Sequence, residues 1–273
     1  MSPTEIAAPR IRLRFVGEVE AGTRVNVFIH GYRSLASSEA VGRAARRVLA
    51  AGAVGENYLL DWDSGGWRRS FRANAATLAG LRAAYRVARL RHVLAPWMIL
   101  VDAGVVSLAE VAQFKFMERR AERVGAELGP LVQAVADGRP VNLIGHSLGA
   151  RVIHHALRRC SSGVPSDGPT AGAAIEDCVL LAGAADLGAA DWRDCLRSIS
   201  GRLYNAYSPR DRILRITPDL RRRVGGGPMP QVVINDAERV VNHRCEEVGH
   251  TTYWTEIDRL LPRVWPGCQV AGG

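Results

Sequence analysis

Apolar residues along this chain fall into short runs, separated by longer segments in which they recur every three or four positions. The short runs predict β-strands, and they cover residues 11–18, 25–30, 57–62, 141–144, 177–183, 202–207 and 231–235. The longer pattern predicts helices at residues 37–50, 118–136, 151–159 and 253–265. Because Gly-rich turns close several strands and helices follow them, the order predicts βαβ units around a parallel sheet.

Residues 67–136 interrupt this alternation, since they contain few turn residues and read as helices almost throughout. Within them, residues 93–116 are rich in Leu, Val, Ile, Met and Trp, but Pro96, Asp102, Gly104 and Glu110 break the run. A membrane-spanning helix needs about 20 apolar residues without charge. We therefore expect a buried or interfacial helical pair. The insertion is either a cap that contacts a membrane or a set of additional core helices.

The chemistry of the chain centres on residues 141–150, Val-Asn-Leu-Ile-Gly-His-Ser-Leu-Gly-Ala. A short apolar strand ends in Gly-x-Ser-x-Gly, and a helical pattern follows at once. This order predicts a nucleophile elbow, a sharp turn that lifts the Ser147 hydroxyl above the sheet. Gly145 and Gly149 are needed where a Cβ would collide with the neighbouring chain. The N–H of Leu148, at the start of the helix, is expected to face developing negative charge.

A serine hydroxyl needs a general base, and the base needs an orienting carboxylate. In a sheet of this kind the chain order is Ser, then Asp or Glu, then His. Asp211 follows the strand at 202–207, and His250 lies between the last predicted strand and the final helix. We therefore expect Ser147, Asp211 and His250 to form a catalytic triad.

Other residues compete for two of these roles. Asp186 and Asp191 follow the preceding strand and are alternatives for the acid, while His243 is the alternative for the base. The remaining nearby histidines are expected to be structural, because closeness in sequence to Ser147 does not give the right approach geometry; they are His146, His154 and His155. The choice between Asp211 and Asp186 stays open at this point.

A second donor to an oxyanion should come from the loop after the strand at 25–30. His30-Gly31-Tyr32 stands there, where Gly31 lets the backbone turn and the Tyr32 amide can point inward. The alternative is an ordinary turn at the end of a strand. The combination with a downstream Gly-x-Ser-x-Gly favours the oxyanion hole.

Composition adds few constraints. The net charge is +9 and Lys115 is the only lysine, so arginine carries nearly all of the positive charge. This reflects either base composition of the gene or attraction to an anionic surface, for which lipid is favoured over nucleic acid because no nucleic-acid motif is present. The five cysteines lack metal-site spacing, and no signal peptide is recognisable. We expect a cytoplasmic protein; association with a membrane surface and export without a signal peptide are the alternatives.

Four motifs together resemble the α/β-hydrolase superfamily; they are residues 28–32, 145–150, 208–211 and 249–250. The resemblance implies one domain over residues 1–273, with a mostly parallel twisted sheet flanked by helices and a helical insertion at 67–136. It implies no metal and no organic cofactor. The run Asn-Ala-Tyr-Ser-Pro-Arg-Asp at 205–211 is also similar to a branch of uncharacterised hydrolases that includes transmembrane-and-coiled-coil-domain proteins.

These observations predict a serine ester hydrolase that acts on a small-molecule or lipid ester, including phospholipid esters at a membrane surface. Ser147 would be the nucleophile, His250 the base and Asp211 the acid, with the amides of Leu148 and Tyr32 as the oxyanion hole. The alternatives are a non-catalytic binding module of the same fold and an acyltransferase that uses the same triad. The substrate, the acyl length and the oligomeric state do not follow from the sequence.

Overall fold

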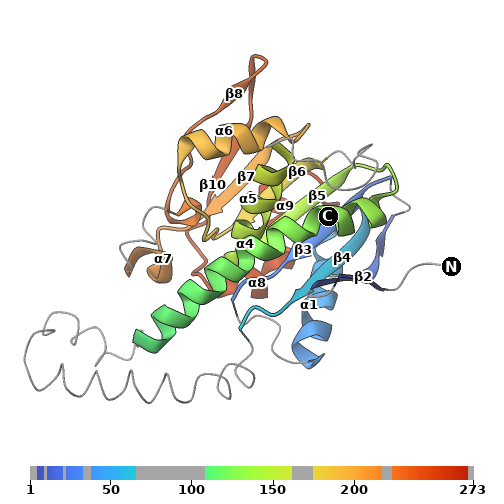
Figure 1. Ribbon diagram of the computed structural model, residues 1–273, viewed down its shortest axis with the longest axis horizontal. Coiled ribbons are helices and arrows are strands. Elements are labelled where there is room, and N and C mark those ends of the chain that lie inside the picture. The colour runs from blue at the N-terminus through green and yellow to red at the C-terminus, as the bar shows by residue number, and fades with distance from the viewer. Residues whose placement is uncertain are drawn as a thin grey trace, which may run out of the picture.

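An eight-stranded sheet with helices on both faces forms the centre of the molecule (Figure 1). The computed structural model describes residues 5–8, 11–20, 23–32, 38–65, 108–161, 175–216 and 223–269. In order across the sheet the strands are β1 (Glu5–Ala8), β2 (Ile11–Val19), β4 (Gly55–Trp62), β3 (Val25–Ile29), β5 (Val141–His146), β6 (Ile175–Leu181), β7 (Leu203–Tyr207) and β10 (Val240–Arg244).

The sheet is parallel from β4 to β10, and only β2 runs antiparallel to both of its neighbours, β1 and β4. Strand order reverses around β3, so that β4 and β5 lie on its two sides. This is the arrangement of the α/β-hydrolase fold, and it confirms the fold class that the sequence predicts. In such a sheet the carboxyl ends of the parallel strands share one edge, where loops can bring distant residues together.

The helices form two layers (Figure 1). On one face lie α4 (Leu108–Ala136), α5 (Leu148–Ser161) and α6 (Ala189–Arg197), whose apolar side chains share one buried cluster with that side of the sheet. On the other face lie α1 (Ser38–Ala50), α8 (Thr252–Thr255) and α9 (Ile257–Val264), which belong to a second cluster. Two shorter elements, α7 (Arg212–Ile216) and η2 (Val224–Gly226), follow β7.

The central strands are apolar at nearly every position because both faces are covered. In β3, Val27 and Ile29 pack into the cluster that contains α4 and α5, whereas Phe28 between them packs into the opposite cluster. All three side chains are fully buried. Side chains of a strand alternate between the two faces of a sheet, so a continuous apolar run is the pattern expected of a strand covered on both sides.

Buried asparagines fix the register of the central strands. Asn26 lies beside Asn57 of β4 and Asn142 of β5. Its amide donates to Asn57 Oδ1 at 3.2 Å, and the Asn142 amide donates to Asn26 Oδ1 at 2.9 Å. Since a buried amide without a partner costs about 1–3 kcal/mol, any slip of one strand is penalised, and the polar ladder specifies the pairing.

One predicted strand is wrong. Residues 231–235 do not form the last strand of the main sheet; β8 (Val233–Ile234) pairs instead with β9 (Ala237–Glu238) in a separate hairpin. Asn235 and Asp236 both have positive φ, which folds the chain back within two residues. The last sheet strand is β10, where the Asn205 amide donates to Asn242 Oδ1 at 3.0 Å. The last three residues of this strand, Asn242, His243 and Arg244, are polar, so a search for apolar runs does not find it.

Other boundaries differ less. The predicted helix at 118–136 begins ten residues earlier, as α4, and the predicted helix at 253–265 is divided at Glu256 into α8 and α9. The strand β1 and the helices α6 and α7 have no counterpart among the predicted elements. Of the insertion at 67–136, the part before residue 108 lies outside the described residues, as does most of the apolar run at 93–116.

Candidate active site

The backbone turns sharply at Ser147, between the end of β5 and the start of α5. Ser147 has φ of 53°, in the left-handed region that a non-glycine residue rarely adopts. Its N–H donates to Leu181 O at 3.0 Å, and its carbonyl accepts from the N–H of Ala184 at 2.9 Å. Hydrogen bonds to the neighbouring β6 segment thus hold the strained residue on both sides.

Glycines make room for this turn. A Cβ on Gly145 would lie 2.7 Å from the carbonyl carbon of Gly149, and a Cβ on Gly149 would collide with the Ile29 carbonyl oxygen. A Cβ on Gly31 would lie 2.7 Å from Ser147 Cβ. Glycine therefore lets the end of β3 and the start of α5 close around the serine, as the Gly-x-Ser-x-Gly pattern indicates.

Three side chains from distant parts of the chain meet in a hydrogen-bonded series. Ser147 Oγ lies 2.8 Å from His250 Nε2, and His250 Nδ1 lies 2.8 Å from Asp211 Oδ2. Asp211 is fully buried, and its other carboxylate oxygen accepts the N–H of Leu214 at 3.0 Å. With both oxygens engaged, the carboxylate is fixed in position and orients the imidazole.

Two loops at the carboxyl edge of the sheet supply the predicted acid and the predicted base. Asp211 follows β7, and His250 follows β10. The loops are joined by the Ser208 hydroxyl, which donates to Val248 O at 2.5 Å and accepts from the N–H of Arg210 at 3.1 Å. Because β7 and β10 are adjacent parallel strands, their loops leave the sheet side by side.

The backbone around Gly31 and Leu148 offers N–H groups next to the serine. Leu148 is the first residue of α5, so its N–H has no acceptor within the helix. The peptide between Gly31 and Tyr32 is oriented by His30, whose Nδ1 lies 3.0 Å from the Gly31 carbonyl oxygen. The Tyr32 ring packs edge-on against Phe114 of α4, with centroids 5.8 Å apart. The helix α4 therefore forms one wall beside the predicted oxyanion residue.

Two buried histidines flank the site. Burial lowers the pKa of His30 to about 4 and that of His146 to about 3. His30 stacks on Trp62, whose indole N–H donates to the His30 carbonyl at 3.3 Å. His146 lies between the elbow and the base, with Nε2 2.9 Å from the His250 carbonyl oxygen. Sequence reasoning treated His146 as structural and missed this contact; its place next to Ser147 was the one signal for it.

The alternative residues lie elsewhere. Asp186 forms ion pairs with Arg223 and with Arg151, the latter at 3.1 Å. Burial works to raise the pKa of Asp186, but the charges of the two arginines outweigh it and lower the pKa. Asp191 lies in α6. His243 lies in the edge strand β10 and stacks on Tyr204 of β7, with ring centroids 6.3 Å apart.

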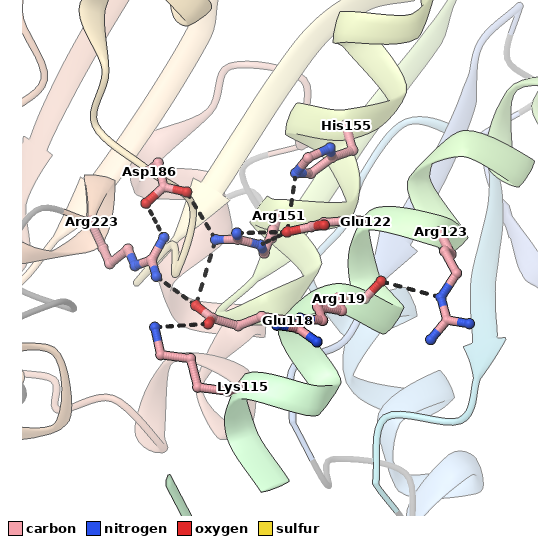
Figure 2. Close-up of polar contacts among 9 residues, drawn as sticks. All are labelled: Lys115, Glu118, Arg119, Glu122, Arg123, Arg151, His155, Asp186 and Arg223. Carbon is pink, nitrogen blue, oxygen red and sulfur yellow. Dashed lines mark hydrogen bonds and ion pairs between the residues drawn. The ribbon is translucent and has the colours of Figure 1, made fainter. Parts of the chain in front are cut away.

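Asp186 belongs to an ion-pair network beside the elbow (Figure 2). The buried Glu118 of α4 lies at the centre of the network, 2.6 Å from Arg223, 3.5 Å from Arg151 and 3.1 Å from Lys115. Arg151, on α5, also donates to Glu122 at 2.8 Å. The network thus ties α4 to the helix that begins at the nucleophile elbow and to the segments that carry Asp186 and Arg223.

All five cysteines are free thiols. Among the described residues, no group of three or more His, Cys, Asp or Glu side chains is arranged to hold a metal ion.

A family model matches residues 24–265, under the description of a protein of unknown function, DUF726. The chain belongs to this family. The DUF726 match includes Tyr32, Ser147, Asp211 and His250, so it spans the whole of the site.

Two curated proteins resemble part of this DUF726 chain. An uncharacterized membrane protein of Caenorhabditis elegans is 32% identical over 152 residues, which are 53% of this chain and 23% of that protein. A transmembrane and coiled-coil domain-containing protein of Oryza sativa subsp. japonica is 29% identical over 145 residues, 52% of this chain and 21% of that protein. The aligned segments therefore span less than a quarter of either relative. None of the helices that the structure describes is both long and apolar enough to cross a membrane.

Solved structures overlap with the DUF726 chain along most of its length. An alpha-beta serine hydrolase homologue from Coxiella burnetii is 9% identical, with a TM-score of 0.45, over 96% of this chain and 97% of that one. The carboxylesterase CesB from Bacillus subtilis is 10% identical, with a TM-score of 0.44, over 95% and 88%. The fold assignment rests on the strand order of the sheet and not on these overlaps.

Proposed function

We propose that this chain is a serine hydrolase that cleaves carboxylic esters through a covalent acyl-enzyme. The observation that carries the proposal is the series Ser147–His250–Asp211, with hydrogen-bond distances of 2.8 Å at both steps. A protein that used the fold only for binding would need none of these three groups in this relation. The strained φ of Ser147 supports the same function, because strain of this kind is retained where a side chain must be presented.

The proposed reaction runs in two halves. Ser147 Oγ attacks the ester carbonyl carbon while His250 Nε2 takes its proton, and Asp211 stabilises the imidazolium that forms. The amides of Leu148 and Tyr32 donate to the oxyanion of the tetrahedral intermediate. When this intermediate collapses, the alcohol leaves with the proton from His250. Water then attacks the acyl-serine with His250 as base, and the carboxylic acid and free Ser147 are released.

We further propose that the substrate is a lipid ester met at an anionic membrane surface. Arginine gives the chain most of its net charge of +9, which favours contact with anionic headgroups. The aromatic pair of Tyr32 and Phe114 supplies apolar surface beside the proposed oxyanion hole. This part is tested separately, by comparing hydrolysis of a short p-nitrophenyl ester with that of the same acyl chain in anionic vesicles. Equal rates per accessible ester would refute the preference for a surface.

Labelling with a fluorophosphonate probe tests the central proposal. Wild-type protein should form an adduct on Ser147, and Ser147→Ala should form none. Asp211→Asn should retain the fold but lose about 10⁴-fold in kcat, the scale seen when an equivalent carboxylate is replaced elsewhere. A folded wild-type protein that does not react would favour a non-catalytic binding module. If added alcohols capture the acyl group in preference to water, the chain is an acyltransferase with the same triad.

A further inference from the structure

His146 connects the nucleophile to the backbone of the base. It is the last residue of β5 and immediately precedes Ser147. Its ring nitrogen Nε2 lies 2.9 Å from the backbone carbonyl oxygen of His250, a residue 104 positions away in the sequence. The His146 side chain is buried, so this contact is shielded from competing water.

The hydrogen bond has only one sense. A carbonyl oxygen can only accept, so Nε2 of His146 must carry the proton and Nδ1 must be bare in the neutral ring. Nδ1 has no hydrogen-bond partner among the described residues. The ring also lies against Tyr253 and Trp254, with centroids 6.5 and 6.1 Å away, so it has little room to turn. His146 is thereby held as a fixed, uncharged donor.

The loop that carries His250 is anchored through two of its backbone carbonyls, those of Val248 and of His250 itself. The Ser208 hydroxyl, three residues before Asp211, holds the carbonyl of Val248 at 2.5 Å. His146, one residue before Ser147, holds the carbonyl of His250 itself. The first contact fixes the base relative to the acid, and the second fixes it relative to the nucleophile.

We propose that His146 is a positioning residue that sets the approach of His250 Nε2 to Ser147 Oγ by anchoring the His250 backbone to the strand end that carries the nucleophile. The inference rests on the proposed hydrolase function and deepens it. Without the anchor, the base keeps its contact with Asp211 through the Ser208 link but loses its fixed distance from Ser147. A displacement of about 1 Å between reacting groups can cost about 100-fold in rate.

Two amide substitutions separate this role from simple core packing. The amide nitrogen of Gln stands as many bonds from Cβ as Nε2 of histidine, so His146→Gln can still donate to the His250 carbonyl. The amide of Asn is one methylene shorter, so His146→Asn has the same chemistry but does not reach. His154→Asn is the matched control, since His154 is also buried and follows the elbow, but its ring packs on Trp192 of α6, with centroids 4.7 Å apart.

The experiment measures kcat and KM with a short p-nitrophenyl ester, the second-order rate of fluorophosphonate labelling, and the urea midpoint of each variant. We expect His146→Asn to lower kcat and the labelling rate together by about tenfold or more, with KM nearly unchanged. His146→Gln should retain most of both rates. His154→Asn should lower the urea midpoint with both rates nearly intact.

Three results would overturn the proposal while leaving the hydrolase function in place. Either His146→Asn reacts as fast as wild type, or His146→Gln falls as far as His146→Asn in proteins of equal stability. A rise in KM with kcat unchanged in His146→Asn would likewise place His146 in substrate binding instead of positioning. Failure of the wild-type protein to label at Ser147 would refute the hydrolase proposal itself, and the inference with it.

Discussion

Acidification should destabilise this protein through its buried neutral histidines, and His146 gives the sharpest case. Burial lowers the pKa of His146 from 6.5 to about 3, with the nearby His250 as a smaller cause. The unfolded chain therefore binds a proton near pH 6.5 that the folded chain refuses until about pH 3. Stability that is fully present above pH 6.5 is lost as the pH falls through this window.

The loss of unfolding free energy at pH 5 depends almost entirely on the imidazole pKa in the unfolded chain. A pH of 5 is about 1.5 units below the imidazole pKa in the unfolded chain, and each unit is worth about 1.36 kcal/mol. The free energy of unfolding therefore falls by about 2 kcal/mol. The folded pKa enters only if it rises toward 5. His30, whose pKa is lowered to about 4 by burial, adds a similar loss. Burial also lowers the pKa values of His155 and His243, which contribute in the same direction.

Comparison of variants isolates the contribution of His146. The free energy of unfolding is measured by urea titration at pH 8 and pH 5 for wild type, His146→Gln and Ser147→Ala. The difference between the two pH values should be about 2 kcal/mol smaller in His146→Gln than in wild type, because the variant has no proton to gain at that position. Ser147→Ala, which changes no titratable group that is charged in this range, should match wild type.

Equal losses in wild type and His146→Gln would show that the folded protein accepts a proton on His146 at pH 5. The reasoning from burial would then be refuted. A smaller loss in Ser147→Ala than in wild type would show instead that the elbow as a whole rearranges on acidification.

Further predictions concern the ion-pair network and the glycines. Glu118→Ala should lower the free energy of unfolding by about 3 kcal/mol or more in urea titrations, because the buried Arg223 loses one of its two carboxylate partners. The control is Arg197→Ala, which removes an exposed ion pair and should change the free energy of unfolding by less than about 1 kcal/mol. Equal effects of the two substitutions would contradict a stabilising role of the network. Gly149→Ala should abolish fluorophosphonate labelling, since its Cβ collides with the β3 backbone. Gly42→Ala, inside α1, should raise the thermal midpoint through a gain of about 0.5–1 kcal/mol, because the nearest atom to an added Cβ is Arg46 Nη1 at 3.8 Å; a lower midpoint would contradict this reasoning.

The local sequence pattern was enough to predict the elements around Ser147, where the residue types that favour the chemistry also require a particular backbone geometry. Gly145 and Gly149 around Ser147 predict a strand, a strained turn and a helix, and the structure has all three in this order. The continuous apolar runs predict central strands because those strands are covered on both faces. The same reasoning does not find the edge strand β10, since only Val240 and Val241 of its five residues are apolar. The run at 231–235 has three adjacent apolar residues and therefore predicts the last strand there instead.

Contacts across long sequence distances could not be read from the chain. Glycine spacing and the ends of strands are local properties, so the sequence predicts the sharp turn at Ser147 and the positions of Asp211 and His250 after strand ends. Which carboxylate meets His250 depends on the packing of the strands and loops: Asp186 pairs with arginines, whereas Asp211 lies next to His250. The contact between His146, the residue before Ser147, and the His250 backbone is also tertiary, because that hydrogen bond exists only when β10 and β5 end at the same edge of one sheet.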